Sequence, residues 1–173
     1  MASLSIAEES KRVMISSSIE DECFATTLMK DLNAENIDVA TSQTIPFAAG
    51  ESDKKWAERK CRSTAAVIII MSNYYQEDDE CIADTNASSM LNSSTFFVKA
   101  KEFEENDWLM HIKGDSKVFD LTTSQKYKCN VKKLIASLKQ LLSSQGISAL
   151  SSQFIVIYSM RMVPFWVCMD GPQ

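Results

Sequence analysis

The sequence predicts one doubly wound α/β domain, in which a parallel sheet carries helices on both faces. Short apolar runs of strand type alternate with segments of helical period over residues 11–146. Residues 65–71 form an unbroken apolar run, which is typical of a central strand covered on both faces. The whole chain has 173 residues, enough for one sizeable core rather than two full domains.

Five segments have the composition of short strands. They are residues 12–16, 37–41, 65–71, 95–99 and 117–121. Parallel neighbours need crossover connections, so the alternation predicts a parallel five-stranded sheet of the flavodoxin-like type, with strand order 2-1-3-4-5. In such a sheet, ligand and partner sites lie at the carboxyl ends of the strands.

Three helices follow from apolar spacing and end signals. The first has apolar positions that we expect in the core: Ile19, Cys23, Phe24, Thr27, Leu28 and Leu32. The second begins after a cap at Ser52 or Asp53 and has Trp56, Ala57 and Cys61 on its apolar side. The last covers residues 131–142, and Gly146 is expected to stop it. The segment between the last two strands is ambiguous.

Both ends of the chain lie outside this pattern. Residues 1–10 are expected to be a tail, and residues 147–173 an extension in which 154–158 is strand-like and 163–168 is apolar around Pro164. Arg161 interrupts the apolar part of this extension, and the uninterrupted stretch that remains is too short to span a membrane. It is interpreted either as an accessory strand or loose tail, or as a segment that docks on a partner or a membrane surface.

Composition excludes several classes of protein. The net charge of −5 argues against a nucleic-acid-binding protein. The five cysteines form no CxxC pair, and we expect most of them to be buried and reduced. The N-terminus turns acidic before any apolar signal region forms. Both observations lead us to expect a cytoplasmic protein. No metal site is predicted: the acidic run 77–80 is typical of a solvated connection, and His111 is the only histidine.

Two small-molecule functions of such sheets are also disfavoured. A phosphoacceptor domain needs an Asp at the end of the third strand, where this chain has Ser72 and Asn73. A phosphate cradle needs a glycine-rich turn after the first strand, where this chain has Ser16, Ser17 and Ser18.

Four stretches resemble the Toll/interleukin-1 receptor (TIR) domain family, over roughly residues 11–146. The first strand with Ser16, Ser17, Glu20 and Asp21 resembles the first TIR box. Residues 45–50 resemble the partner-binding loop after the second strand. The most specific match is the run of basic helix end, buried strand, Ser, aromatic and Cys at residues 58–81, and the helix at 131–142 resembles the last helix of the family.

The resemblance implies an interaction module that binds other TIR domains in Toll-like and interleukin-1 receptor signalling. It implies partner contacts through Ile45, Pro46, Phe47 and Gly50. A basic helix is expected to form a second surface with Lys54, Lys55, Arg59, Lys60 and Arg62. Opposite charge on the 77–80 run suggests homo-oligomers or filaments. About ten residues precede the first strand, so we expect an adaptor or modulator without a death domain.

An enzymatic alternative stays open. Some TIR domains hydrolyse NAD with a glutamate three residues after the conserved Cys, and in this chain that position is Asp84, after Cys81. A carboxylate one methylene shorter is displaced by about 1 Å, which can cost about a hundredfold in rate. We therefore expect no enzyme and no cofactor, with NAD as the substrate in the alternative.

Overall fold

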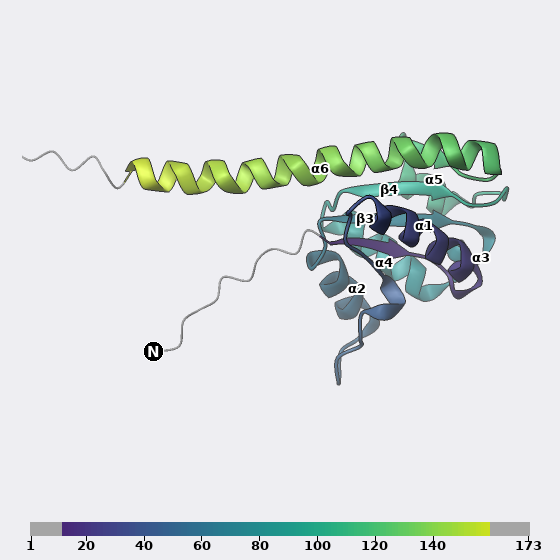
Figure 1. Cartoon of the computed structure of the whole chain (residues 1–173). Helices are drawn as coiled ribbons and strands as arrows, with labels where there is room; N and C mark the ends of the chain where they lie inside the picture. The colour runs from purple at the N-terminus through teal and green to yellow at the C-terminus, as the bar shows by residue number, and fades with distance from the viewer. Residues whose placement is uncertain (1–11, 160–173) are drawn as a thin grey trace, which may run out of the picture. The chain divides into compact units, whose positions relative to one another are not determined.

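The computed structural model describes residues 12–159, with side chains described as far as Gln145. Its sheet has five strands: β1 (Val13–Ser16), β2 (Val39–Thr41), β3 (Ala66–Met71), β4 (Thr95–Lys99) and β5 (Val118–Asp120). Every pairing is parallel, and the strand order is β2-β1-β3-β4-β5. The predicted flavodoxin-like sheet is therefore confirmed (Figure 1).

Helices connect these strands. The α-helices are α1 (Glu22–Ala34), α2 (Asp53–Arg62), α3 (Asn73–Glu77), α4 (Asp79–Met90), α5 (Asp107–Lys113) and α6 (Ser124–Ser159), with short 3-10 turns at Ile19–Asp21 and Ser42–Thr44. The segment that the sequence left ambiguous contains α5, which begins at an Asn106 side chain that accepts from Leu109 N.

The buried strand β3 divides the core into two halves, one on each face of the sheet. All six of its residues are buried, and alternate side chains point to opposite faces. Val67, Ile69 and Met71 share a cluster with Met14 of β1 and with apolar residues of α2, α4 and α5. Figure 1 shows α2 and α4 together on that side of the sheet.

Helices α1 and the first part of α6 lie side by side. The Phe24 and Tyr127 rings meet edge to face at 6.0 Å, the Tyr127 hydroxyl donates to Asp31 Oδ2 at 2.7 Å, and Lys139 Nζ lies 2.6 Å from Glu35 Oε2. Leu28, Leu32, Leu134 and Leu138 are buried.

Two expectations about helix starts were wrong. Ile19 is 65% exposed and lies in the 3-10 turn ahead of α1, and Cys23 is also exposed. Leu28 and Leu32 of the predicted stripe are buried as expected, and Ala25 is buried with them. Ser52 stands at the cap position of α2, but its side chain makes no capping hydrogen bond.

Helix α6 is longer than predicted. It continues through Gly146 to Ser159, so the expected stop at Gly146 and the strand-like interpretation of residues 154–158 were wrong. The chain divides into two compact units, residues 1–139 and 140–173, and α6 extends from one into the other. Within the described part of the chain, no helix combines the length and hydrophobicity needed to cross a bilayer.

Some expectations fall outside the described residues. These are the tail at 1–10, the apolar segment 163–168 and Cys168. Of the remaining cysteines, Cys61 and Cys81 are buried as expected, whereas Cys23 and Cys129 are exposed.

Candidate functional site

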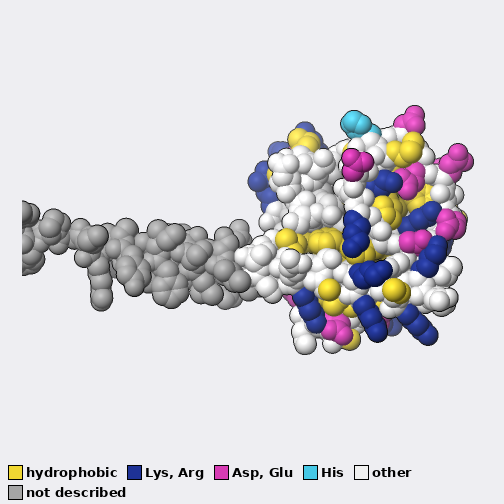
Figure 2. Space-filling model, turned by 90° about the horizontal axis from the view of Figure 1, so that it is seen from above, with side chains coloured by type: hydrophobic (Ala, Val, Ile, Leu, Met, Phe, Trp, Pro, Cys, Tyr) yellow, Lys and Arg dark blue, Asp and Glu magenta, His cyan; other side chains and the backbone are white. Residues whose placement is uncertain are grey.

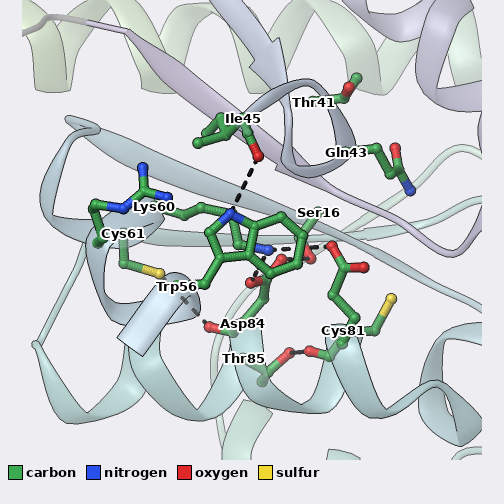
Figure 3. Close-up of polar contacts among 12 residues, drawn as sticks. Ser16, Thr41, Gln43, Ile45, Trp56, Lys60, Cys61, Cys81, Asp84 and Thr85 are labelled. Carbon is green, nitrogen blue, oxygen red and sulfur yellow. Dashed lines mark hydrogen bonds and ion pairs between the residues drawn. The ribbon is translucent and has the colours of Figure 1, made fainter. Parts of the chain in front are cut away.

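A buried ion pair lies under the carboxyl end of β1, at the position where the sequence places the alternative catalytic carboxylate. Lys60 Nζ lies 2.7 Å from Asp84 Oδ1, and the two side chains are 0% and 1% exposed. The Ser16 hydroxyl donates to Asp84 Oδ2 at 3.0 Å. The strand β1, the helix α2 and the helix α4 each contribute one of these three groups, and both Asp84 oxygens are engaged (Figure 3).

Lys60 is enclosed by further partners. Its Nζ lies 3.2 Å from Glu80 Oε1 and 3.6 Å from the centre of the Trp56 ring, a cation–π distance. Trp56 donates from Nε1 to the carbonyl of Ile45 at 3.1 Å, so the indole is tied to the start of the 45–50 loop. Figure 3 shows this ring in front of the Lys60 and Asp84 head groups. We call Ser16, Trp56, Lys60, Glu80 and Asp84 the buried cluster.

Tyr75 extends the hydrogen bonding on the far side of Ser16. It is fully buried, its hydroxyl lies 3.0 Å from Ser16 Oγ and 2.8 Å from Thr85 Oγ1, and it donates to the Cys81 carbonyl at 3.2 Å. Burial raises the pKa of this phenol well above its usual range. The hydroxyl therefore stays protonated and acts as a structural link.

The titration of the neighbouring groups also follows from burial. Burial raises the pKa of the Asp84 carboxyl, and the adjacent Lys60 ammonium partly opposes this effect. Burial, with the Asp84 charge adding to it, raises the pKa of the Cys61 thiol to about 12, and burial likewise raises that of Cys81. Neither thiol is a reactive thiolate near neutral pH.

The 45–50 loop is exposed and braced from behind. Figure 1 shows it extending away from the sheet ahead of α2, where Pro46 and Gly50 are exposed and Phe47 is 48% exposed. Gly50 has φ of 75°, a left-handed conformation that favours glycine. The Phe47 ring meets Trp56 edge to face at 5.1 Å, so the exposed loop and the buried cluster share one indole.

Arg59 holds the loop in its shape. It donates from Nη2 to the Pro46 carbonyl at 2.7 Å and binds Glu51 through Nε and Nη2 at 2.9 and 2.8 Å. The hydrogen bond from Arg59 is the main cause that lowers the pKa of Glu51 to about 2. Ala48 N also donates to Glu51, at 3.1 Å.

The predicted basic helix divides into two faces. Lys54, Lys55 and Arg62 are exposed and Arg59 is half-buried, but Lys60 is completely buried. The expectation that Lys60 belongs to an exposed surface was therefore wrong. The spacing of Trp56, Ala57, Lys60 and Cys61 carries the signal that was missed, because these four positions share one face of a helix.

The first-box residues also divide between core and surface. Ser16, Ser17 and Asp21 are buried, while Glu20 is exposed. Asp21 accepts a hydrogen bond from the Ser72 hydroxyl and pairs with Lys101 Nζ at 3.0 Å. Ser17 Oγ has no hydrogen-bond partner among the described residues. The contacts of Asp21 with Ser72 and Lys101 thus join the ends of β1, β3 and β4.

The acidic run and the histidine are not ligand sets. Asp78 caps α4 by accepting from Glu80 N and Cys81 N, and Glu80 pairs with Lys60, so only Glu77 and Asp79 of the run are exposed. His111 is exposed and lines a hollow of about 690 Å³ between α2, α4 and α5. Residues 12–145 contain no group of three acidic, His or Cys side chains that could hold a metal.

Two solved structures with a similar fold are TIR domains. The TIR domain of the Toll-related receptor TRR-2 from Hydra magnipapillata matches with a TM-score of 0.60 and 13% identity, over 75% of this chain and 98% of that one. The RPS4 and RRS1 TIR domain heterodimer matches with a TM-score of 0.51 and 12% identity, over 76% of this chain and 98% of that one. The chain thus has the TIR fold. No protein-family model and no curated protein sequence matches it.

Proposed function

We propose that this chain is a TIR-type interaction module that binds other TIR domains through the 45–50 loop, as an adaptor or modulator of Toll-like and interleukin-1 receptor signalling in the cytoplasm. The observation that carries the proposal is the exposed loop itself. Phe47 is 48% exposed although it is a large apolar residue, and the surrounding backbone is held by Arg59 and Glu51. An exposed aromatic on a braced loop suits a binding contact, because little entropy is lost when a partner covers it.

Two likenesses support the proposal. The fold is that of TIR domains, and one of the matching structures is described as a heterodimer of two TIR domains. Within the family, Glu80 and Cys81 resemble the Glu-Cys pair of the myeloid differentiation adaptor of Toll-like receptors, where most receptors have Trp-Cys. We therefore propose that this chain binds the same kind of TIR partners as that adaptor.

Charge supplies a second contact surface. Lys54, Lys55 and Arg62 are exposed on α2, and Glu77 and Asp79 are exposed near α3 and α4. Opposite charges on different segments favour head-to-tail contact between copies, and such contacts form filaments when they do not close into a ring. Homo-oligomers or filaments therefore belong to the proposal.

The buried cluster argues against the hydrolase alternative. A catalytic carboxylate must reach the substrate within hydrogen-bond distance. Both Asp84 oxygens are already engaged by Lys60 and Ser16, and the Asp84 side chain is 1% exposed. We propose that the chain neither hydrolyses NAD nor uses a cofactor, and that Asp84 is a structural residue.

The binding proposal is tested by co-precipitation of the full chain with a second tagged copy and with the TIR domains of Toll-like receptors and their adaptors. Replacing Pro46 and Phe47 together with alanine should reduce binding at least tenfold. Tyr74→Ala is the matched control, because Tyr74 is a similarly exposed aromatic, at 51%, outside the loop. Equal binding by the loop variant and the wild type would contradict the loop assignment.

The enzymatic alternative has its own assay. Purified wild-type chain incubated with NAD should release no nicotinamide above a heat-denatured control. Release that Asp84→Asn abolishes, in a variant that still melts cooperatively, would overturn the non-enzymatic proposal.

A further inference from the structure

The hollow between α2, α4 and α5 has no role in the function proposed so far. Its volume is about 690 Å³, and Lys54 and Glu58 of α2 form one of its walls. All three helices belong to the compact unit 1–139. The 45–50 loop leads directly into the same helix α2, so one helix carries both an exposed loop and an open hollow.

The lining of the hollow combines apolar and polar residues in an ordered way. Ala87 is buried, and Ala83 and Ile112 pack against the core cluster, so the deepest part of the lining is apolar. Lys54 and His111 are exposed and therefore lie further out. An apolar centre with a polar rim is the usual anatomy of a protein–protein contact surface.

Met90 leaves a large apolar side chain uncovered at the hollow. It lines the hollow and is 65% exposed. Methionine adapts its shape to a partner, and its sulfur makes favourable contacts with aromatic rings. The 45–50 loop offers such a ring in the exposed Phe47 and contains no charged residue. On the face that Figure 2 shows, by comparison, the apolar side chains lie among many charged ones.

Helix geometry places the loop and the hollow on opposite sides of α2. Trp56 contacts the Phe47 ring, so it marks the loop side of the helix. Lys54 and Glu58 each lie two residues from Trp56, which corresponds to about 200° around an α-helix. The loop of one chain therefore packs on the far side of α2 from the hollow of that chain, and a second copy can supply the loop that fills it.

The exposed charges beside the two surfaces favour such a contact. Asp53 lies three residues before Trp56 and hence on the loop side of α2, whereas Lys54 lines the hollow. Neither is in an ion pair with another described side chain. The lining also contains the exposed His111 and one acidic residue, the half-buried Glu58. Opposite charges at the two edges orient one copy on the next.

We propose that the hollow between α2, α4 and α5 receives the 45–50 loop of a second copy of this chain, with the Phe47 ring against Met90. This inference rests on the proposed function, because it supplies the receiving surface for the binding loop. Each copy donates its loop to one neighbour and accepts the loop of another. A contact between two different surfaces is heterologous, so it builds an open series of copies or a ring rather than a two-fold dimer.

The test is sedimentation equilibrium of the full chain over a range of concentrations. The wild type should form species larger than a dimer. Met90→Arg should weaken self-association roughly thirtyfold, because it puts a charge where the loop needs an apolar anchor. The matched control is Met110→Arg, since Met110 is a methionine of α5 that is 45% exposed but does not line the hollow. The control should change self-association less than about threefold.

A mixture of two variants tests whether the loop and the hollow bind each other. The loop variant, Pro46→Ala with Phe47→Ala, keeps an intact hollow, and Met90→Arg keeps an intact loop. Each variant alone should be monomeric at concentrations where the wild type associates. The mixture should form 1:1 dimers and nothing larger, because only one kind of contact remains. Thermal melting checks that each variant is folded.

Several outcomes would overturn the proposal. These are a wild type that stays monomeric or stops at a dimer, unchanged self-association of Met90→Arg, an equal loss in Met110→Arg, and a mixture without dimers. If Met90→Arg lost binding to receptor TIR domains while its self-association persisted, the hollow would receive a different protein.

The outcome is separable from that of the proposed function. Met90→Arg leaves the loop unchanged, so it should still co-precipitate with the TIR domains of receptors. If Met90→Arg affects neither kind of binding while the loop variant loses both, only the receiving surface is wrong. A loop variant that binds like the wild type contradicts the proposed function itself.

Discussion

The buried cluster around Asp84 and the 45–50 loop differ in almost every physical respect, although the Trp56 indole contacts both. In the cluster, the Lys60–Asp84 ion pair is withdrawn from water, with Lys60 at 0% and Asp84 at 1% exposure, and the partly exposed Glu80 lies at its edge. In the loop, apolar groups are left in water, with Phe47 at 48% exposure. Asp84, the one residue that the family resemblance marks for chemistry, is thus held in a buried ion pair, whereas Phe47 of the loop is exposed to contact.

The comparison also shows how a single helix serves both regions. Lys60 of α2 turns inward to the ion pair, while Arg59, one residue earlier, turns toward the loop and binds Glu51 and the Pro46 carbonyl. A shift of the whole helix α2 would therefore act on both the core and the loop. Replacing a single residue that contacts only one of the two regions can separate their contributions.

The largest expected effect comes from Asp84→Ala. It leaves the Lys60 ammonium buried without its closest partner, and breaking a buried ion pair in this way costs about 3–5 kcal/mol of unfolding free energy. Urea denaturation measures the loss. The matched control is Glu35→Ala, which breaks the exposed pair with Lys139 and should cost far less stability than Asp84→Ala, because water and salt screen an exposed pair.

A second variant separates pairing from packing in the cluster. Lys60→Met combined with Asp84→Leu removes both charges at similar volume, and such replacements are often neutral or stabilising. The double variant should therefore recover most of the stability that Asp84→Ala loses. If Asp84→Ala and Glu35→Ala had equal effects, the contrast between a structural cluster and an exposed surface would not hold.

An intermediate effect is expected from Phe47→Ala. The variant loses an edge-to-face contact with Trp56 at 5.1 Å, and aromatic pairs of this kind contribute about 0.5–1.5 kcal/mol. Differential scanning calorimetry should show a small decrease in melting temperature with a cooperative transition. A loss as large as that of Asp84→Ala would mean that Phe47 belongs to the core rather than to a contact surface.

The sheet could be predicted from the sequence because its signals are local. Residues 65–71 are apolar without interruption, and a strand with that pattern is covered on both faces. The end of α6 was predicted incorrectly because its local signals are ambiguous. A glycine often stops a helix, but Gly146 lies inside α6, and the aliphatic run at 154–158 suits a helix as well as a strand.

The buried cluster could be predicted only in part. The family resemblance points to Asp84 through its position after Cys81, but nothing local indicates that a lysine in a run of basic residues turns inward. Lys and Arg are rarely fully buried unless they are paired, and the partner of Lys60 is 24 residues further along the chain. A long-range ion pair of this kind becomes visible only when the fold brings α2 and α4 together.

The smallest expected effect concerns pH and the loop. The pKa of Glu51 is lowered from 4.5 to about 2, so its pairing with Arg59 is fully present above about pH 4.5 and is lost as the pH falls toward 2. Amide hydrogen exchange of residues 46–51 should therefore accelerate over that range, after correction for the intrinsic pH dependence of exchange, before the amides of β3 are affected. Glu51→Gln should show the faster corrected exchange already at pH 6 and should remove its change between pH 4.5 and 2. If β3 and the loop lost protection together, the loop would not be an independently braced element, and acid would act on the whole domain.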